Sequence, residues 1–285
     1  MVMLAGCAFL LVALLALPDQ AAQAAREAIA VWGLDVAPSL FPYMVLCRTL
    51  TARLHTRRIP AHFVAAALGL MGGSPSGAAG VSACAQREGL TRRQVLPLAA
   101  LTGTLSPMFL LSTVRGWTGD AHLARLLTAA HIFGALFAFL VVSLYAGRSA
   151  KPRPACDPSS GAQANPIAES VQAILSVGGC IVFFSVLAAV ARLLIPGLPD
   201  SAAAVLHAVL EVAGGARALA HAPFDPQARA VLLSAACGFT GLSILSQNLL
   251  FFRPLGVRMS HLLMIALLRA VGAAAAMACL MLVAP

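Results

Sequence analysis

The chain consists of apolar segments of membrane-spanning length that are separated by short basic stretches. Of its 285 residues, 60% are hydrophobic and only 10% are charged, whereas about 25% of the residues in an ordinary soluble domain are charged. So few charges cannot cover a water-exposed surface, and soluble enzymes and nucleic-acid-binding modules are therefore excluded. The sequence predicts an all-α polytopic membrane protein, with room for about eight or nine apolar segments of roughly 20 residues each.

The basic residues indicate which loops face the cytoplasm, because the cytoplasmic loops of membrane proteins are enriched in lysine and arginine. The net charge is +9, from 19 basic and 10 acidic side chains. Four loops are strongly basic, namely those near Arg57, Arg92, Lys151 and Arg258. With these loops in the cytoplasm, twelve basic residues lie inside, six lie outside, and Arg269 lies in the last span. The excess of positive charge is thus a sign of topology.

The apolar segment 61–88 begins and ends at basic loops, and a single span cannot begin and end on the same side of a membrane. The motif Gly72-Gly73-Ser74-Pro75-Ser76-Gly77 divides this segment into two arms. Each arm has about 12 residues, or roughly 18 Å of helix, which is shorter than a bilayer core of about 30 Å. The segment is therefore predicted to form a re-entrant helical hairpin with its tip near the middle of the membrane.

The second half of the chain repeats the first. Three matches follow in order: Leu40–Leu46 with Val182–Leu187 and Gly72-Gly73 with Gly214-Gly215, both at an offset of 142, and then Gly103–Ser106 with Thr240–Ser243. Three spans separate the starts of the two copies, so the second copy is predicted to be inverted in the membrane. Inverted repeats with broken transmembrane helices are a common transporter architecture.

These features divide the chain into four parts: an N-terminal transmembrane or signal-like segment with a loop (1–26), a first repeat (27–147), a cytoplasmic linker (148–164) and a second repeat (165–285). We expect the N-terminal apolar segment to be retained as a span, because no basic residue precedes it as in a signal peptide. The basic residues do not decide whether residues 202–222 re-enter the membrane or cross it. Only the repeat argues for a second hairpin there.

The tip of the first hairpin is a candidate site for an anion. A half-helix that begins there has unpaired backbone N–H groups and the positive end of its dipole at its N-terminus. Ser74 and Ser76 add hydroxyl groups, so the tip suits a carboxylate or a phosphate. The alternative is a close helix crossing, in which the glycines only allow packing.

Two further stretches, Thr102–Pro107 and Gly238–Ser243, are predicted to be unwound parts of spans. Irregular backbone at membrane depth must line a cavity or be covered by protein. Gln247 and Asn248 follow about one helical turn after the second stretch. They either donate hydrogen bonds to a polar ligand or bond to a neighbouring helix.

Glu211 lies deep in an apolar segment, where ionisable residues are functional candidates by default. It binds a coupling proton or cation, contacts the substrate, or serves as a structural carboxylate for backbone N–H groups at the second hairpin tip. The candidate substrate-binding residues are Gly73, Ser74, Ser76, Gly77, Thr102, Gly103, Ser106, Glu211, Gly214, Gly215, Thr240, Gly241, Ser243, Gln247 and Asn248.

No motif in the chain indicates catalysis. A Walker motif, a dinucleotide-binding fingerprint and a G-x-S-x-G elbow are all absent from the sequence. His207 and Glu211 share a helical face, but one histidine and one glutamate do not make a metal site. The seven cysteines are scattered without a C-x-x-C spacing. We therefore expect a protein that is not an enzyme and that has no cofactor and no metal site.

Several motifs together resemble the sporulation integral membrane protein YlbJ (SpoVV) family, which carries the nucleoside-recognition "Gate" domain. The matching stretches are Pro38-Ser39-Leu40-Phe41-Pro42, Gly73-Ser74-Pro75-Ser76-Gly77-Ala78, Glu88-Gly89-Leu90, Glu211-Val212-Ala213-Gly214-Gly215, and Gly238-Phe239-Thr240-Gly241-Leu242-Ser243 with Gln247 after it. The resemblance covers residues 27–280. The chain departs from the family pattern at Ser74, where an aromatic residue is usual, and at Ala79, where a lysine is common.

The resemblance implies a secondary carrier, distantly similar to concentrative nucleoside transporters, in a bacterial cell membrane. Family members are implicated in moving dipicolinic acid out of the mother cell, which implies the mother-cell or outer forespore membrane. Dipicolinate is a planar dianion, which suits the helix-terminus site; another organic anion, a nucleoside-like solute, or a non-transporting scaffold in spore or envelope assembly are the alternatives. The expected partners are a small anionic substrate, the lipid bilayer and a coupling proton or cation, with no nucleic acid. Substrate, transport direction, coupling ion and a homo-oligomeric state are left open.

Overall fold

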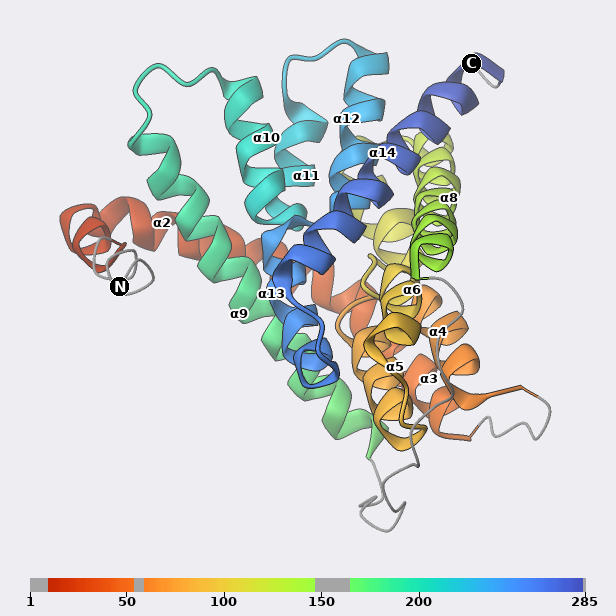
Figure 1. The fold of residues 1–285 in the computed structure, drawn as a ribbon. Coiled ribbons are helices and arrows are strands. Elements are labelled where there is room, and N and C mark those ends of the chain that lie inside the picture. Colours follow the sequence, from red (N-terminus) through yellow and green to blue (C-terminus); the bar gives the residue numbers. More distant parts are fainter. Residues whose placement is uncertain (1–9, 54–58, 147–164, 284–285) are drawn as a thin grey trace.

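The computed structural model of the chain describes residues 10–53, 59–146 and 165–283. This part is built from helices and contains no strand (Figure 1). Five helical segments are long and apolar enough to cross a membrane: Pro18–Leu50, Ala121–Ala146, Pro166–Leu193, Pro226–Leu255 and Met259–Val283. The prediction of an all-α polytopic membrane protein is therefore confirmed.

The first repeat begins with a long helix made of α2 (Pro18–Ala30), the π-helical η1 (Val31–Val36) and α3 (Ala37–Arg53). A hairpin of α4 (Ala61–Gly72) and α5 (Ser76–Arg87) follows. The next crossing is interrupted, with α6 (Arg92–Thr102) before the break and η2 (Phe109–Val114) and α7 (Arg115–Thr118) after it. The repeat closes with α8 (Ala121–Ala146).

The second repeat has the same order of elements. The long helix is α9 (Pro166–Leu193), and the hairpin consists of α10 (Asp200–Leu210) and α11 (Val212–His221). The broken crossing is α12 (Pro226–Phe239) and α13 (Gly241–Phe252), followed by the short η4 (Arg253–Leu255), and α14 (Met259–Val283) closes the repeat. The segment 202–222 is thus a hairpin and does not cross the molecule. In Figure 1 the two hairpins enter from opposite ends, α4–α5 from below and α10–α11 from above, as an inverted repeat requires.

Equivalent residues of the two repeats meet where the repeats cross. Trp32 and Ile174 are 142 positions apart, and Trp32 Nε1 donates to the Ile174 carbonyl at 3.1 Å. On α8 and α14, Gly134 and Gly272 are 138 positions apart, and a Cβ built at Gly272 would lie 3.2 Å from the Cα of Gly134. Because each contact joins a position to its own equivalent, an approximate two-fold axis passes through both crossings.

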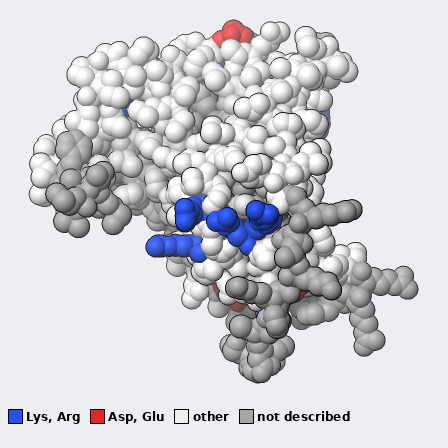
Figure 2. All heavy atoms as spheres, in the orientation of Figure 1, with Lys and Arg blue, Asp and Glu red and all other residues white. Residues whose placement is uncertain are grey.

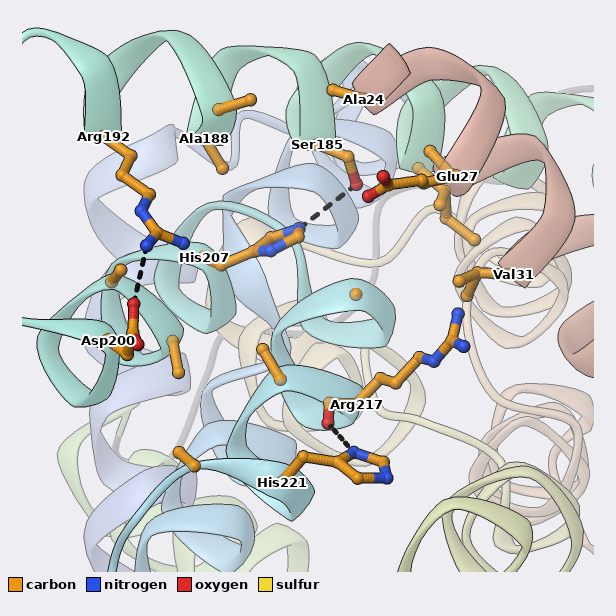
Figure 3. A pocket seen from close by; sticks show the side chains of 18 of the residues that line it. Ala24, Glu27, Val31, Ser185, Ala188, Arg192, Asp200, His207, Arg217 and His221 are labelled. Atoms are coloured by element: carbon orange, nitrogen blue, oxygen red, sulfur yellow. Dashed lines mark hydrogen bonds and ion pairs between the residues drawn. The ribbon is translucent and has the colours of Figure 1, made fainter. Parts of the chain in front are cut away.

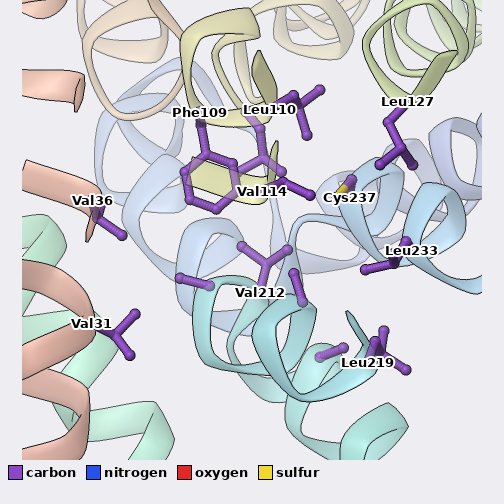
Figure 4. Packing of buried hydrophobic residues seen from close by; sticks show 14 of the residues in the cluster. Val31, Val36, Phe109, Leu110, Val114, Leu127, Val212, Leu219, Leu233 and Cys237 are labelled. Atoms are coloured by element: carbon purple, nitrogen blue, oxygen red, sulfur yellow. The ribbon is translucent and has the colours of Figure 1, made fainter. Parts of the chain in front are cut away.

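Each hairpin lies in its own apolar core. Around the second hairpin, Val212 and Leu219 pack with Phe109, Leu110 and Leu233 (Figure 4). The first hairpin packs in a separate cluster of residues from α4, α5, α6, α13 and α14. Many large apolar side chains remain exposed on the long helices, as on a lipid-facing surface; they include Leu144, Phe183, Leu267 and Val271.

The structure does not describe all of the predicted domains. Residues 1–9 and the linker 148–164 lie outside the described residues. The boundary after residue 26 falls inside the continuous helix α2, so no loop is found there.

Candidate functional site

The tip of the first hairpin contacts the break between α6 and η2. Gly73 has φ +68°, and a Cβ built on it would lie 2.5 Å from the backbone nitrogen of Ser106, so glycine is required by conformation and by space. The backbone N–H of Ser74 donates to the Thr104 carbonyl at 2.7 Å. The Ser74 hydroxyl donates to Asn248 Oδ1 at 2.6 Å and so connects the tip to α13 of the other repeat.

Other residues of the first motif serve packing or face a different neighbour. A Cβ built at Gly77 would lie 2.7 Å from the Cα of Gly69, so Gly77 allows the close crossing of α4 and α5. Thr102 packs against Gly69 and bonds back to the Leu98 carbonyl at 3.0 Å. Ser76 accepts a hydrogen bond from Arg48 Nε at 3.3 Å. Gly77 therefore allows a close helix crossing, whereas Ser74 and Ser76 make polar contacts.

Glu211 forms the tip of the second hairpin and caps α11. Its carboxylate is 1% exposed and accepts hydrogen bonds from the backbone N–H groups of Ala213 at 2.7 Å and Gly214 at 2.6 Å. A side-chain acceptor at this position satisfies N–H groups that have no partner within the helix. The structure therefore supports the structural alternative for Glu211. Gly215 is a packing residue, since its Cβ would lie 2.1 Å from the Cα of Ala208.

A buried arginine joins the two helix breaks. The second break occurs at Thr240 and Gly241, which have φ +69° and +73°. Arg269 on α14 is 1% exposed and donates to the Gly103 carbonyl and, from Nη2, to Thr240 Oγ1 at 3.2 Å. Among residues 10–53, 59–146 and 165–283, no carboxylate forms an ion pair with this guanidinium.

Both tips and both breaks border one small cavity. Five predicted residues line it: Ser74, Ser106, Glu211, Ser243 and Gln247. Within the described part of the chain, Ser243 Oγ and Gln247 Oε1 are buried without a hydrogen-bond partner. The cavity offers about 30 Å³ to the centres of water molecules, which is enough for a water and too small for an organic solute.

The remaining predicted residues fall into two groups. Some form the walls behind the cavity through the contacts given above, namely Gly73, Thr102, Gly103, Thr240, Gly241 and Asn248. Others lie away from the cavity lining, namely Ser76, Gly77, Gly214 and Gly215.

A larger pocket that the sequence did not predict opens between α2, α9, α10 and α11 (Figure 3). We call this pocket, of about 930 Å³, the vestibule. His207 lies in it and hydrogen bonds with Ser185 Oγ at 3.2 Å. The His207 ring rests on Gly214, because a Cβ built at Gly214 would lie 2.6 Å from His207 Nε2 and 3.2 Å from Glu211 Oε2. The Glu211 cap therefore lies between the vestibule and the small cavity.

At the opposite end of the molecule, an ion pair joins the two repeats. Arg48 Nη1 of α3 lies 2.5 Å from Glu169 Oε2 of α9. The same arginine bonds to Ser76, directly after the first hairpin tip. This contact ties the first hairpin and both long helices together.

Sequence reasoning missed two buried ionisable residues on the closing helices. Arg269 lies on α14 and His131 on α8, outside the motifs that predicted the site. His131 is 2% exposed, and its ring lies beside the Leu105 backbone. The two residues are 138 positions apart, like Gly134 and Gly272, so they occupy equivalent places. The rule that flagged Glu211, an ionisable group within an apolar span, also applies to both.

The described residues contain no group of three or more histidine, cysteine, aspartate or glutamate side chains that could hold a metal ion.

Comparison with known proteins gives one relative. The chain is 24% identical over 295 residues to the sporulation integral membrane protein YlbJ of Bacillus subtilis (strain 168), an alignment that covers 84% of this chain and 72% of the relative. No protein-family model and no solved structure matches the chain. The Gate domain therefore stays a prediction. The similarity extends over most of both proteins and agrees with the motifs: this chain is an integral membrane protein that is similar to YlbJ.

Proposed function

We propose that the protein is a secondary carrier for a small organic anion, and that the cavity between the hairpin tips becomes its substrate site when the hairpins move apart. The observation that carries this proposal is the meeting of two opposed hairpins and two helix breaks around buried polar groups without partners, Ser243 Oγ and Gln247 Oε1. Unpaired polar groups are costly in a protein interior, so a ligand that bonds to them would recover that cost. Transporters of inverted-repeat architecture place their substrates at such helix breaks.

Three features favour an anion. The Arg269 guanidinium is buried behind the cavity and contacts only neutral acceptors in the described structure. Helix α5 begins at Ser76, two residues after the cavity-lining Ser74, and its positive end has no side-chain cap. Glu211 is already engaged by two backbone N–H groups. Dipicolinate, which the family resemblance implies, is the first anion to test, and a nucleoside is the neutral comparison.

The two ends of the molecule differ, and this difference supports alternating access. One end is held shut by Arg48 and Glu169 at 2.5 Å, while the vestibule is open at the other end. At the repeat offset of 142, Glu169 corresponds to Glu27, and Arg192 lies two residues beyond the equivalent of Arg48. Both Glu27 and Arg192 line the open vestibule. In the proposed cycle, these two residues pair when the vestibule closes and the Arg48–Glu169 pair opens.

In this state Arg192 has a different partner. It donates to Asp200 Oδ1 at 2.6 Å, an exposed contact between α9 and the start of α10. The proposed closing movement exchanges Asp200 for Glu27. Surface ion pairs contribute little on their own, so such an exchange would not trap either state.

The test is solute flux in proteoliposomes that contain the full chain. We expect counterflow of labelled dipicolinate or another small dicarboxylate, and we expect its loss in the variants Ser243→Ala and Gln247→Ala. Ser234→Ala is the matched control, because Ser234 is buried on α12, bonds to the Ala273 carbonyl at 2.9 Å and does not line the cavity. Absence of flux for dicarboxylates, nucleosides and dipicolinate alike would favour the non-transporting scaffold.

A further inference from the structure

Three arginines converge on a second pocket, away from the proposed substrate site. The pocket has a volume of about 500 Å³ and is lined by Arg92, Arg253 and Arg258 together with Leu249, Gly256, Val257 and Met259. Each arginine comes from a different segment: the start of α6, η4, and the loop before α14. Figure 2 shows basic side chains gathered in a band across this face of the molecule.

The fold holds these arginines close to one another without an acidic partner. The ion pairs of the described residues use Arg48, His62 and Arg192 on their basic side. The stem of Arg92 lies along the turn at Gly256, where a Cβ would be 3.8 Å from Arg92 Cδ. Three like charges in one pocket repel one another, and a bound anion relieves this repulsion. Guanidinium groups suit phosphate in particular, because they can donate two parallel hydrogen bonds to it.

The surroundings of the pocket indicate where such a phosphate comes from. Leu249 and Met259 form part of its wall, and Leu250 beside it is 72% exposed on the lipid-facing surface. The positive-inside rule puts this end of the molecule at the cytoplasmic leaflet. Basic pockets between helices at that level suit anionic lipid head groups, whose acyl chains can lie against the neighbouring apolar helix.

We propose that Arg92, Arg253 and Arg258 form a binding site for a phosphate group, supplied by the head group of an anionic phospholipid. The site is independent of the carrier proposal, because none of its lining residues lines the cavity or the vestibule. Its test therefore needs no transport assay.

The experiment measures the phospholipid retained by the full chain after purification and exchange into nanodiscs of mixed phosphatidylglycerol and phosphatidylcholine. The pocket variant is Arg253→Gln/Arg258→Gln. The matched control is Arg87→Gln/Arg93→Gln, which removes two charges from the end of α5 and the start of α6 but leaves the pocket lining intact. We expect the enrichment of phosphatidylglycerol to fall about tenfold or more in the pocket variant, because two guanidinium groups no longer bond to the phosphate, and less than about twofold in the control, whose arginines do not line the pocket.

Two further arms identify the ligand and protect against misfolding. Inorganic phosphate added at millimolar concentration should leave the lipid bound if the head group is the ligand, whereas release of the lipid would assign the site to the free anion. If the glutamine variant does not fold, Arg253→Lys/Arg258→Lys replaces it; we expect an intermediate loss, because lysine keeps the charge and lacks the paired donors. Equal enrichment in the pocket variant and the control, or no enrichment in the unmodified chain, would overturn the proposal.

Discussion

Removing the charge of Glu169 should shift the protein towards a state that is open at the cytoplasmic end. Arg48 Nη1 and Glu169 Oε2 are 2.5 Å apart and join the long helices of the two repeats. Arg48 also donates to Ser76 beside the first hairpin tip. The variant Glu169→Gln keeps the size of the side chain and one acceptor oxygen but removes the charge, so it weakens the closed end without opening a hole.

The exposure of the pair sets the size of the effect. The side chain of Arg48 is 16% exposed and that of Glu169 is 43% exposed, so solvent screens the pair. A value of about 1 kcal/mol, at the upper end for exposed pairs, is appropriate, and the 3–5 kcal/mol expected on breaking a fully buried pair is not. A change of about 1 kcal/mol alters the equilibrium between the two access states about fivefold.

The assay is cysteine labelling from the side of the vestibule. In a chain whose native cysteines are replaced, Ala189→Cys places a reporter in the vestibule lining. A membrane-impermeant maleimide then reports the fraction of molecules with an open vestibule. We expect Glu169→Gln to lower this fraction and Glu27→Gln to raise it, because Glu27 is proposed to pair only in the opposite state. Glu88→Gln is the control, since Glu88 bonds to His62 within the first hairpin and does not join the repeats.

The reasoning is refuted if Glu169→Gln labels at the rate of the unmodified chain and of Glu88→Gln. A second check is the reversed pair Arg48→Glu/Glu169→Arg, which should restore the original labelling rate. Failure of the reversed pair in a folded protein would mean that the contact does not act through its charge.

Three further predictions concern stability and the site. The variant Arg269→Met should abolish anion flux but change the free energy of unfolding by no more than about 1 kcal/mol, because relief of the buried charge offsets two lost hydrogen bonds. A decrease above about 3 kcal/mol in a denaturant titration would show that the arginine is chiefly structural. Gly215→Ala should destabilise the protein by about 1–3 kcal/mol, because the added methyl group overpacks the contact of α10 with α11. The control Gly179→Ala should be neutral or stabilising, because nothing lies within 4 Å of the new Cβ. Similar melting temperatures for the two variants would contradict this prediction. Glu211→Gln should lower the melting temperature by only about 2–4 °C, as for the loss of part of one helix cap; an unchanged melting temperature would show that the carboxylate does not stabilise α11.

The topology was predictable because lipid allows few solutions. Basic loops on both sides of segment 61–88 required a hairpin, and Gly73 with φ +68° occurs where the sequence predicted the tip. The second hairpin is not flanked by basic loops on both sides, so only the internal repeat predicted it. The boundary after residue 26 falls within α2, because no proline or glycine interrupts the helix there.

The site was only partly predictable, because contacts between distant residues decide it. The motifs indicated the tips and breaks, and five of the predicted residues line one cavity. Ser76 differs because Arg48 lies beside it, a contact across 28 positions that no local pattern shows. The vestibule depends on how α2 crosses α9, and that crossing is fixed by the bond from Trp32 to Ile174. Such tertiary contacts follow from packing and not from periodicity.

The two hairpins are equivalent in the repeat, but their tips differ in charge. Glu211 fills the N-terminus of α11 with its own carboxylate, whereas α5 begins after Pro75 with no side-chain cap in the described structure. An anion in the cavity would therefore be repelled by the second tip and attracted by the first, where the helix dipole is free. Arg269 adds a positive charge behind both breaks. In the proposed carrier, a bound dicarboxylate would direct one carboxylate to α5 and keep its neutral part beside Glu211, so symmetric movement of the two repeats would act on an asymmetric site.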